Sequence, residues 1–284
     1  MATNDESGAG STESAEGPKG PTEPDRPGQP GTWGPGATRP GIDPGVGPGS
    51  GPGAAGPRGD SGSETRDKTR DRLLSRWNAL LVSARGGEPD PDPAPYGRNL
   101  IERWSEPQRR YHTVDHLLDV LNRVDELAPH TPGADIDAVL LAAWFHDAVY
   151  RPDRSENEER SAALAERALP EAGVPRSLTD EAARLVRLTV DHDPDEGDVN
   201  GELLCDADLA VLAGSPGEYA QYAAAVRQEY GFVPDGPFLE GRAEVLRQLL
   251  GLPRLFRTPY GRERWEHVAR RNMETEMELL VTGD

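Results

Sequence analysis

Residues 138–147 read Ala-Val-Leu-Leu-Ala-Ala-Trp-Phe-His-Asp, an apolar run that ends in two polar side chains, His146 and Asp147. The segment around it, from Asp135 to about Tyr150, is apolar on nearly every side, which predicts a helix at the centre of the fold. An ionised carboxylate beside a histidine is costly in such surroundings unless something compensates it. A divalent cation would neutralise the carboxylate and accept the imidazole lone pairs, so the run indicates a metal site.

Apolar residues recur at helical spacing through the rest of the chain after residue 70. The pattern predicts helices over residues 71–84, 114–127, 135–150, 155–168, 178–192, 202–213, 216–230, 239–250 and 260–280, with a further short stretch around 100–104. Thr113 or Asp115 is expected to cap one of them and Thr179 another. Since no segment alternates convincingly with a period of two, we expect an all-α fold: a single domain of about nine helices over residues 71–284.

The first seventy residues differ in composition from the rest. Residues 1–70 consist mainly of Gly, Pro, Ser, Thr and Glu, and Trp33 is their single aromatic residue. Such a segment cannot bury enough apolar surface to offset its chain entropy, so we expect a disordered low-complexity tail.

Charge and composition limit the possible partners and location. The formal net charge is −19, from 50 acidic and 31 basic residues, which argues against binding of a nucleic-acid polymer. A small phosphorylated substrate, such as a nucleotide, remains compatible, because a metal and one or two arginines can reverse the potential inside a cleft. With one cysteine, no signal-peptide pattern and no apolar run of membrane-spanning length, we expect a cytoplasmic protein without membrane contacts.

Two histidines precede the predicted central helix. His112 and His116 are one helical turn apart and would face the same side of a helix that starts near Thr113. We expect His116, deeper in the helix, to bind the metal. We expect His112 to face the substrate as a general acid, because an imidazole of near-neutral pKa suits proton transfer. Such a pair also occurs on ordinary helix surfaces. The alternative for His146 is that it is a hydrogen-bonded histidine of the core instead of a metal ligand.

Two carboxylates follow in the segment Cys205-Asp206-Ala207-Asp208-Leu209. Residues two apart on a helix do not share a face, so only one of these carboxylates should coordinate the metal directly. We expect Asp208 to be that ligand. Asp206 has several alternatives: a cap or bridge behind the ligands, a ligand for a second metal or the substrate, or a solvated surface residue.

The remaining candidates are less specific. His192 is expected to bind a second metal or the substrate, or simply to interact with a helix dipole. Asn157 and Glu158 open a helix just after the His-Asp pair, where they are candidates either to orient the attacking water or to cap the helix. Arg227 and Arg242 are candidates for phosphate contacts, because the guanidinium fork matches phosphate oxygens.

The order His116, His146-Asp147, Asp208 resembles the HD-domain superfamily of metal-dependent phosphohydrolases, over roughly residues 70–282. The segments 110–116, 144–150, 157–162 and 206–209 look like those of small bacterial HD proteins described as predicted phosphohydrolases. The first segment is also similar to the Tyr-His-Asn-x-x-His-x-x-Asp-Val motif of cyclic-nucleotide phosphodiesterases, although this chain has Thr113 in place of the Asn.

The resemblance implies a mechanism for the candidate residues. It implies that a divalent ion (Mn, Mg, Fe, Co, Ni or Zn) is held by His116, His146, Asp147 and Asp208, and that it activates water to hydrolyse a phosphoester of a small molecule or nucleotide. His112 would act as general acid, and Glu158 would position water. Asp147 would be a catalytic residue as well as a metal ligand. The alternatives are a non-catalytic HD module that binds a nucleotide and a di-iron oxygenase on the same fold.

Overall fold

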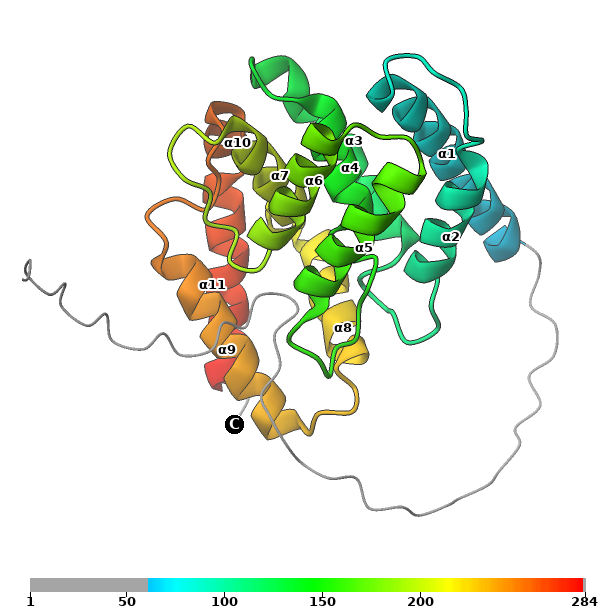
Figure 1. Ribbon diagram of the computed structural model, residues 1–284. Helices are drawn as coiled ribbons and strands as arrows, with labels where there is room; N and C mark the ends of the chain where they lie inside the picture. The colour runs from blue at the N-terminus through cyan, green and yellow to red at the C-terminus, as the bar shows by residue number, and fades with distance from the viewer. Residues whose placement is uncertain (1–60, 283–284) are drawn as a thin grey trace, which may run out of the picture. The chain divides into compact units, whose positions relative to one another are not determined.

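The computed structural model describes residues 61–282, and over this range the chain folds into eleven α-helices and two short 3-10 helices without a strand (Figure 1). The all-α prediction is therefore confirmed. There are more helices than the nine or so expected, because the short stretch near residue 100 is a full helix and residues 259–282 divide into two helices at Trp265. The elements are α1 (Ser61–Ala84), α2 (Ala94–Trp104), α3 (Val114–Leu127), η1 (Ala128–His130), α4 (Ile136–Phe145), α5 (Asn157–Glu171), α6 (Arg176–Leu188), α7 (Val199–Leu209), η2 (Ala210–Ala213), α8 (Pro216–Glu229), α9 (Asp235–Gly251), α10 (Pro259–Arg264) and α11 (Glu266–Thr282).

The start of α1 corrects the boundary expected between tail and domain. Residues 61–70 belong to α1, although their composition placed them with the tail. The rest of the predicted tail, residues 1–60, lies outside the described residues.

Helix α4 is the central element, as its composition predicts. It packs against α1, α3, α5, α6 and α7, which surround it in Figure 1. All its side chains from residue 138 onward are buried except Leu140. Burial of a large apolar side chain such as Leu141 or Phe145 contributes roughly 1.5–3 kcal/mol, so this helix contributes much of the core. The helix ends at Phe145, shorter than expected, and His146 and Asp147 follow directly at its C-terminus.

Helix α3 begins where the sequence predicts. The Thr113 side chain accepts a hydrogen bond from the Asp115 N–H, so Thr113 rather than Asp115 is the N-cap. The cap satisfies one of the free donors in the first turn and orients that turn, which carries His116.

Helix α6 differs from its predicted limits at both ends. It starts at Arg176 after Pro175, and Thr179 lies inside it as a buried residue whose hydroxyl donates to the Pro175 carbonyl. The predicted capping role of Thr179 is therefore wrong. The helix ends at Leu188, which leaves His192 in the loop that follows.

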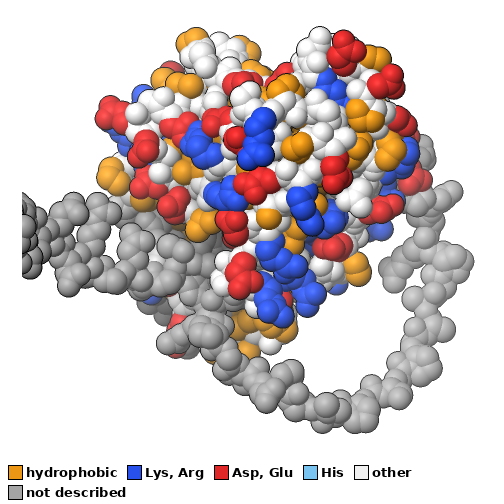
Figure 2. All heavy atoms as spheres, viewed as in Figure 1, with side chains coloured by type: hydrophobic (Ala, Val, Ile, Leu, Met, Phe, Trp, Pro, Cys, Tyr) orange, Lys and Arg blue, Asp and Glu red, His pale blue; other side chains and the backbone are white. Residues whose placement is uncertain are grey.

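Charged side chains of both signs intermingle on the face of the molecule drawn in Figure 2. Several charged residues of the described range pair: Arg187 contacts both Glu159 and Glu166, and Arg184 contacts Asp198. Exposed pairs of this kind contribute little to stability, with a median of about 0–1 kcal/mol. No helix in the described range is both long enough and apolar enough to pass through a membrane.

Candidate metal centre

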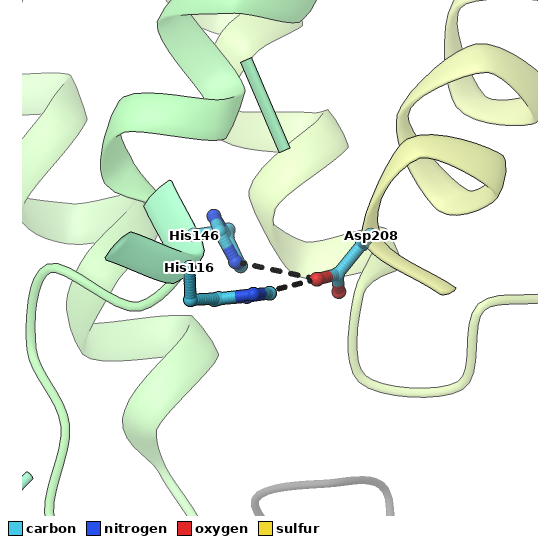
Figure 3. Close-up of side chains that lie close together, drawn as sticks. All are labelled: His116, His146 and Asp208. Carbon is cyan, nitrogen blue, oxygen red and sulfur yellow. Dashed lines mark ion pairs between the residues drawn. The ribbon is translucent and has the colours of Figure 1, made fainter. Parts of the chain in front are cut away.

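Three side chains from distant parts of the sequence meet beside the end of α4. His116 comes from the first turn of α3, His146 from the residue after α4, and Asp208 from the last turn of α7. Both imidazoles point at one carboxylate oxygen, Asp208 Oδ1, with Nε2 at 3.1 Å for His116 and 3.7 Å for His146 (Figure 3). Ligand atoms of all three lie within 4.8 Å of one another, which is close enough to share one metal ion.

Asp147, the fourth predicted ligand, lies at the edge of this cluster. Its Oδ2 is 3.4 Å from His146 Nε2 and 3.8 Å from His112 Nε2. Because α4 ends at Phe145, the adjacent residues His146 and Asp147 can both turn toward the same point. The structure thus brings all four predicted ligands together.

The buried His146 ring has one nitrogen with no hydrogen-bond partner. Its Nδ1 is 2.8 Å from the Ala143 carbonyl oxygen, which can only accept, so Nδ1 carries the proton. With Nδ1 bonded to that carbonyl, Nε2 is the ring nitrogen left to bind a ligand, and it is buried and lacks a hydrogen-bond partner. A buried polar atom left without a partner costs about 1–3 kcal/mol. A cation between the three side chains would satisfy this atom, so the residues present fit a metal ion.

The charge of Asp208 also fits a cation site. Burial alone would raise the pKa of the Asp208 carboxyl. The charge of His146 and hydrogen bonds from His116 and His192 outweigh burial and hold that pKa well below its usual range. Asp208 is therefore an anion at neutral pH. Imidazole nitrogens combined with carboxylate oxygens suit Zn, Fe, Mn, Co or Ni.

His192 joins the cluster from the loop after α6. Its Nε2 lies 2.8 Å from Asp208 Oδ2, the carboxylate oxygen that the other two histidines do not share. Its backbone has a φ of 54°, in the left-handed region that non-glycine residues seldom adopt. Such a conformation costs of order 1 kcal/mol and persists only where its surroundings hold it, here by the contact with Asp208.

His112 is held by a carboxylate that sequence reasoning missed. It lies before the N-cap of α3 rather than inside the helix, and its side chain is buried. Its Nδ1 is 2.5 Å from Glu229 Oε1. The other oxygen, Glu229 Oε2, accepts hydrogen bonds from the backbone N–H groups of residues 110, 111 and 112. One carboxylate thus orients both the ring and the loop that carries it.

These contacts change the acidity of His112 from what the sequence suggested. Burial lowers the pKa of His112, but the Glu229 and Asp147 carboxylates outweigh burial and raise the pKa to about 9. The ring is therefore protonated at neutral pH, rather than near its midpoint. Burial opposes ionisation of Glu229 too, yet the His112 charge holds the pKa of Glu229 below its usual range.

A signal for Glu229 does exist in the sequence. Tyr219, Tyr222, Val226 and Glu229 follow one another at spacings of three, four and three residues, and all four are buried on one face of α8. A glutamate on an otherwise apolar helical stripe indicates a buried charge that needs a partner.

Glu158 and Asn157 have separate roles at the start of α5. Glu158 is half-buried and lines the same hollow as His112, His192 and the metal cluster. Burial and the neighbouring Asp147 carboxylate raise the pKa of Glu158 to about 7. Asn157 makes hydrogen bonds with the backbone of residues 151 and 154, so it closes the loop after α4 instead of facing the hollow.

The structure does not bring Asp206 to the cluster. Its two oxygens accept hydrogen bonds from the backbone N–H groups of Arg257 and Thr258 and from the Thr258 hydroxyl. Burial raises the pKa of Asp206 to about 6 against the effect of these bonds. Among the predicted alternatives, Asp206 acts as the anchor of the loop that leads into α10.

Neither of the predicted phosphate-binding arginines faces the hollow. Arg242 is buried and contacts Glu276 and the Tyr222 hydroxyl. Arg227 donates to the carbonyls of residues 230 and 233 and to Asp235. Their guanidinium groups hold α8, α9 and α11 in place, which corrects the prediction that they contact phosphate.

Comparison with known proteins finds no matching family model, no matching curated protein and no matching solved structure. The interpretation of the metal centre therefore rests on its own residues and geometry.

Proposed function

We propose that this chain is an HD-type, metal-dependent phosphohydrolase that cleaves a phosphoester of a small molecule in the cytoplasm. The observation that carries the proposal is the buried, unpartnered Nε2 of His146, which lies 3.7 Å from Asp208 Oδ1 in the cluster with His116. These three residues, with Asp147 beside them, would hold the divalent ion. When bound, such an ion lowers the pKa of a water molecule and polarises phosphoryl oxygens.

His112 is placed to act as the general acid. Its Nδ1 is occupied by Glu229, so the proton available for transfer is the one on Nε2, the nitrogen on the side of Asp147. With a pKa of about 9, the ring carries that proton at neutral pH. Proton donation by a positioned side chain contributes about 10²–10⁴-fold to a rate.

Glu158 is placed to accept the proton that the attacking water loses. It lines the same hollow, and its pKa of about 7 lets it take up a proton near neutral pH. In the proposed reaction the water oxygen forms the new bond to phosphorus and the ester P–O bond breaks. The Nε2 proton of His112 passes to the departing oxygen to give an alcohol, and the proton of the water passes to Glu158.

Two observations favour this reaction over the alternatives considered. Within the described residues there is one cluster of potential ligands, whereas a di-iron oxygenase needs a full set for a second iron. The buried His112, held between two carboxylates, can give its Nε2 proton to a departing oxygen, which a module that only binds nucleotides does not require.

The test is metal analysis combined with phosphate release from the purified full-length chain. His146→Ala should lose both the bound metal and the hydrolysis of phosphoesters. His267→Ala is the matched control, because His267 is exposed on α11 and should change neither. A wild-type chain that takes up no Mn, Zn, Fe, Co, Ni or Mg on titration contradicts the proposal, as does a metal-loaded chain that hydrolyses no phosphoester of a broad panel.

A further inference from the structure

The residues that line the hollow beside the metal centre include both polar and aliphatic side chains. Among the polar ones are His146 and Asp208 of the cluster, with Asp147, His112 and Glu158. The aliphatic ones are Leu209, Val211 and Leu212 from α7 and η2, and Val245 and Leu249, which are one turn apart on α9. A group that fills the hollow next to the metal centre therefore contacts aliphatic side chains.

The charges around the hollow disfavour a second anionic group. No Lys or Arg is found among the described residues that line it, while Asp147, Glu158 and Asp208 supply carboxylates. Arg109, which lies nearby, donates instead to the His112 carbonyl and to Glu106. One phosphoryl group can be neutralised by a divalent metal ion. A further phosphate or carboxylate would enter a partly buried, acidic space without a cationic partner, which is costly.

We propose that the site takes a monophosphate ester of an uncharged, apolar group, rather than a polyphosphate or an ester that carries a second anionic group. The phosphoryl group would lie at the metal centre and the apolar group against Leu209, Leu212, Val245 and Leu249. This inference rests on the proposed function for the phosphoryl group, and on the aliphatic and acidic lining of the hollow for everything attached to it.

Binding of alkylphosphonates tests the inference separately from catalysis, because their C–P bond is not hydrolysed. Ethyl-, butyl- and hexylphosphonate are titrated into the Mn²⁺-loaded full-length chain by isothermal calorimetry. We expect Kd to fall by up to about fourfold per added methylene, the equivalent of about 0.8 kcal/mol, and the heat-capacity change to become more negative. We expect 4-phosphonobutyrate, which ends in a carboxylate, to bind at least tenfold more weakly than butylphosphonate.

Two neighbouring leucines on α9 give a matched pair of variants. Leu249→Ala should weaken binding of hexylphosphonate about fivefold or more while leaving ethylphosphonate nearly unchanged. Leu250→Ala is the control, because Leu250 is also half-buried on α9 but does not line the hollow. It should keep the wild-type ratio of the two affinities. Metal content and thermal unfolding, measured on both variants, show whether each is folded.

The outcomes separate the inference from the proposed function. The inference is overturned if Kd does not change with the length of the alkyl chain, if 4-phosphonobutyrate binds as tightly as butylphosphonate or more tightly, or if no phosphonate binds. This holds even if the chain hydrolyses 4-nitrophenyl phosphate. A chain-length gradient that depends on Leu249 supports the inference. If that gradient is found but butyl phosphate and 4-nitrophenyl phosphate are not hydrolysed, the proposed function fails while the ligand class of the hollow stands.

Discussion

Replacement of Glu229 by glutamine tests the link between the buried carboxylate and the acidity of His112. In the wild type, Glu229 is the largest cause that raises the His112 pKa from 6.5 to about 9. At about 1.4 kcal/mol per pKa unit, this shift means that the fold stabilises protonated His112 over neutral His112 by about 3 kcal/mol. Glutamine keeps the size of the side chain but removes its charge. It also puts an NH₂ group against either His112 Nδ1–H or the three backbone donors.

The sign of the pH dependence follows from the direction of the shift. A histidine with a raised pKa in the folded state adds stability that is complete below the unfolded-state pKa, near 6.5. That stability is lost as the pH rises through about 9. Wild-type chain treated with a chelator should therefore lose about 3 kcal/mol of unfolding free energy from this group between pH 6 and pH 10. Glu229→Gln should be less stable by a similar amount at pH 6, and the difference should shrink at pH 10.

Three measurements check this prediction. Denaturant unfolding at both pH values gives the free energies, and NMR titration gives the His112 pKa, which we expect to fall toward 6.5 in Glu229→Gln. In the metal-loaded enzyme, kcat for an alkyl phosphate should begin to fall near pH 7 in the variant instead of near pH 9. Glu240→Gln, an exposed change on α9, is the control and should alter none of these. A His112 pKa that stays above about 8 in Glu229→Gln would refute the reasoning.

Four further changes probe the carboxylates and histidines around the cluster. Asp208→Ala should abolish metal binding, whereas Asp206→Ala should keep the metal but lose about 2–4 kcal/mol of stability, because buried donors at Thr258 lose their acceptor; metal analysis and denaturant unfolding measure both. His112→Ala should keep the metal and lose about 10²–10⁴-fold in kcat on alkyl phosphates, with a much smaller loss on 4-nitrophenyl phosphate, whose leaving group needs no proton. Equal losses on both substrates would remove the general-acid role. His192→Ala should weaken metal binding about 10–100-fold through the lost contact with Asp208, as measured by competition with a chelator.

The central helix could be predicted because its composition alone decides its position. An uninterrupted apolar segment such as 138–145 has no polar face to turn toward water, so it must be surrounded by other helices. Helix ends were harder to predict. Thr179 has the chemistry of an N-cap, but it faces inward with Ala182, Ala183 and Val186, and burial of that face requires the helix to start before it.

The candidate metal ligands could be predicted for a related reason. A polar residue that interrupts a series of buried apolar positions can be recognised in the sequence. This is the case for His116, His146 and Asp208. For Asp206 and Asp208, helical geometry also predicts that they face opposite ways. The residue that each carboxylate meets from another part of the chain, Thr258 for Asp206 and His192 for Asp208, then determines what that carboxylate does.

Glu229 shows why a site assembled over long distances needs the structure. Its partners, residues 110–112, precede it by more than a hundred positions, and no local pattern connects the two segments. The stripe on α8 indicates a buried charge, but a buried charge on its own does not name its partner. Only the packing of α8 against the loop before α3 identifies it as His112. The same packing turns a histidine expected to titrate near neutral pH into a charged one. The acidity of the proposed general acid is thus a property of the tertiary fold rather than of the His-x-x-x-His segment.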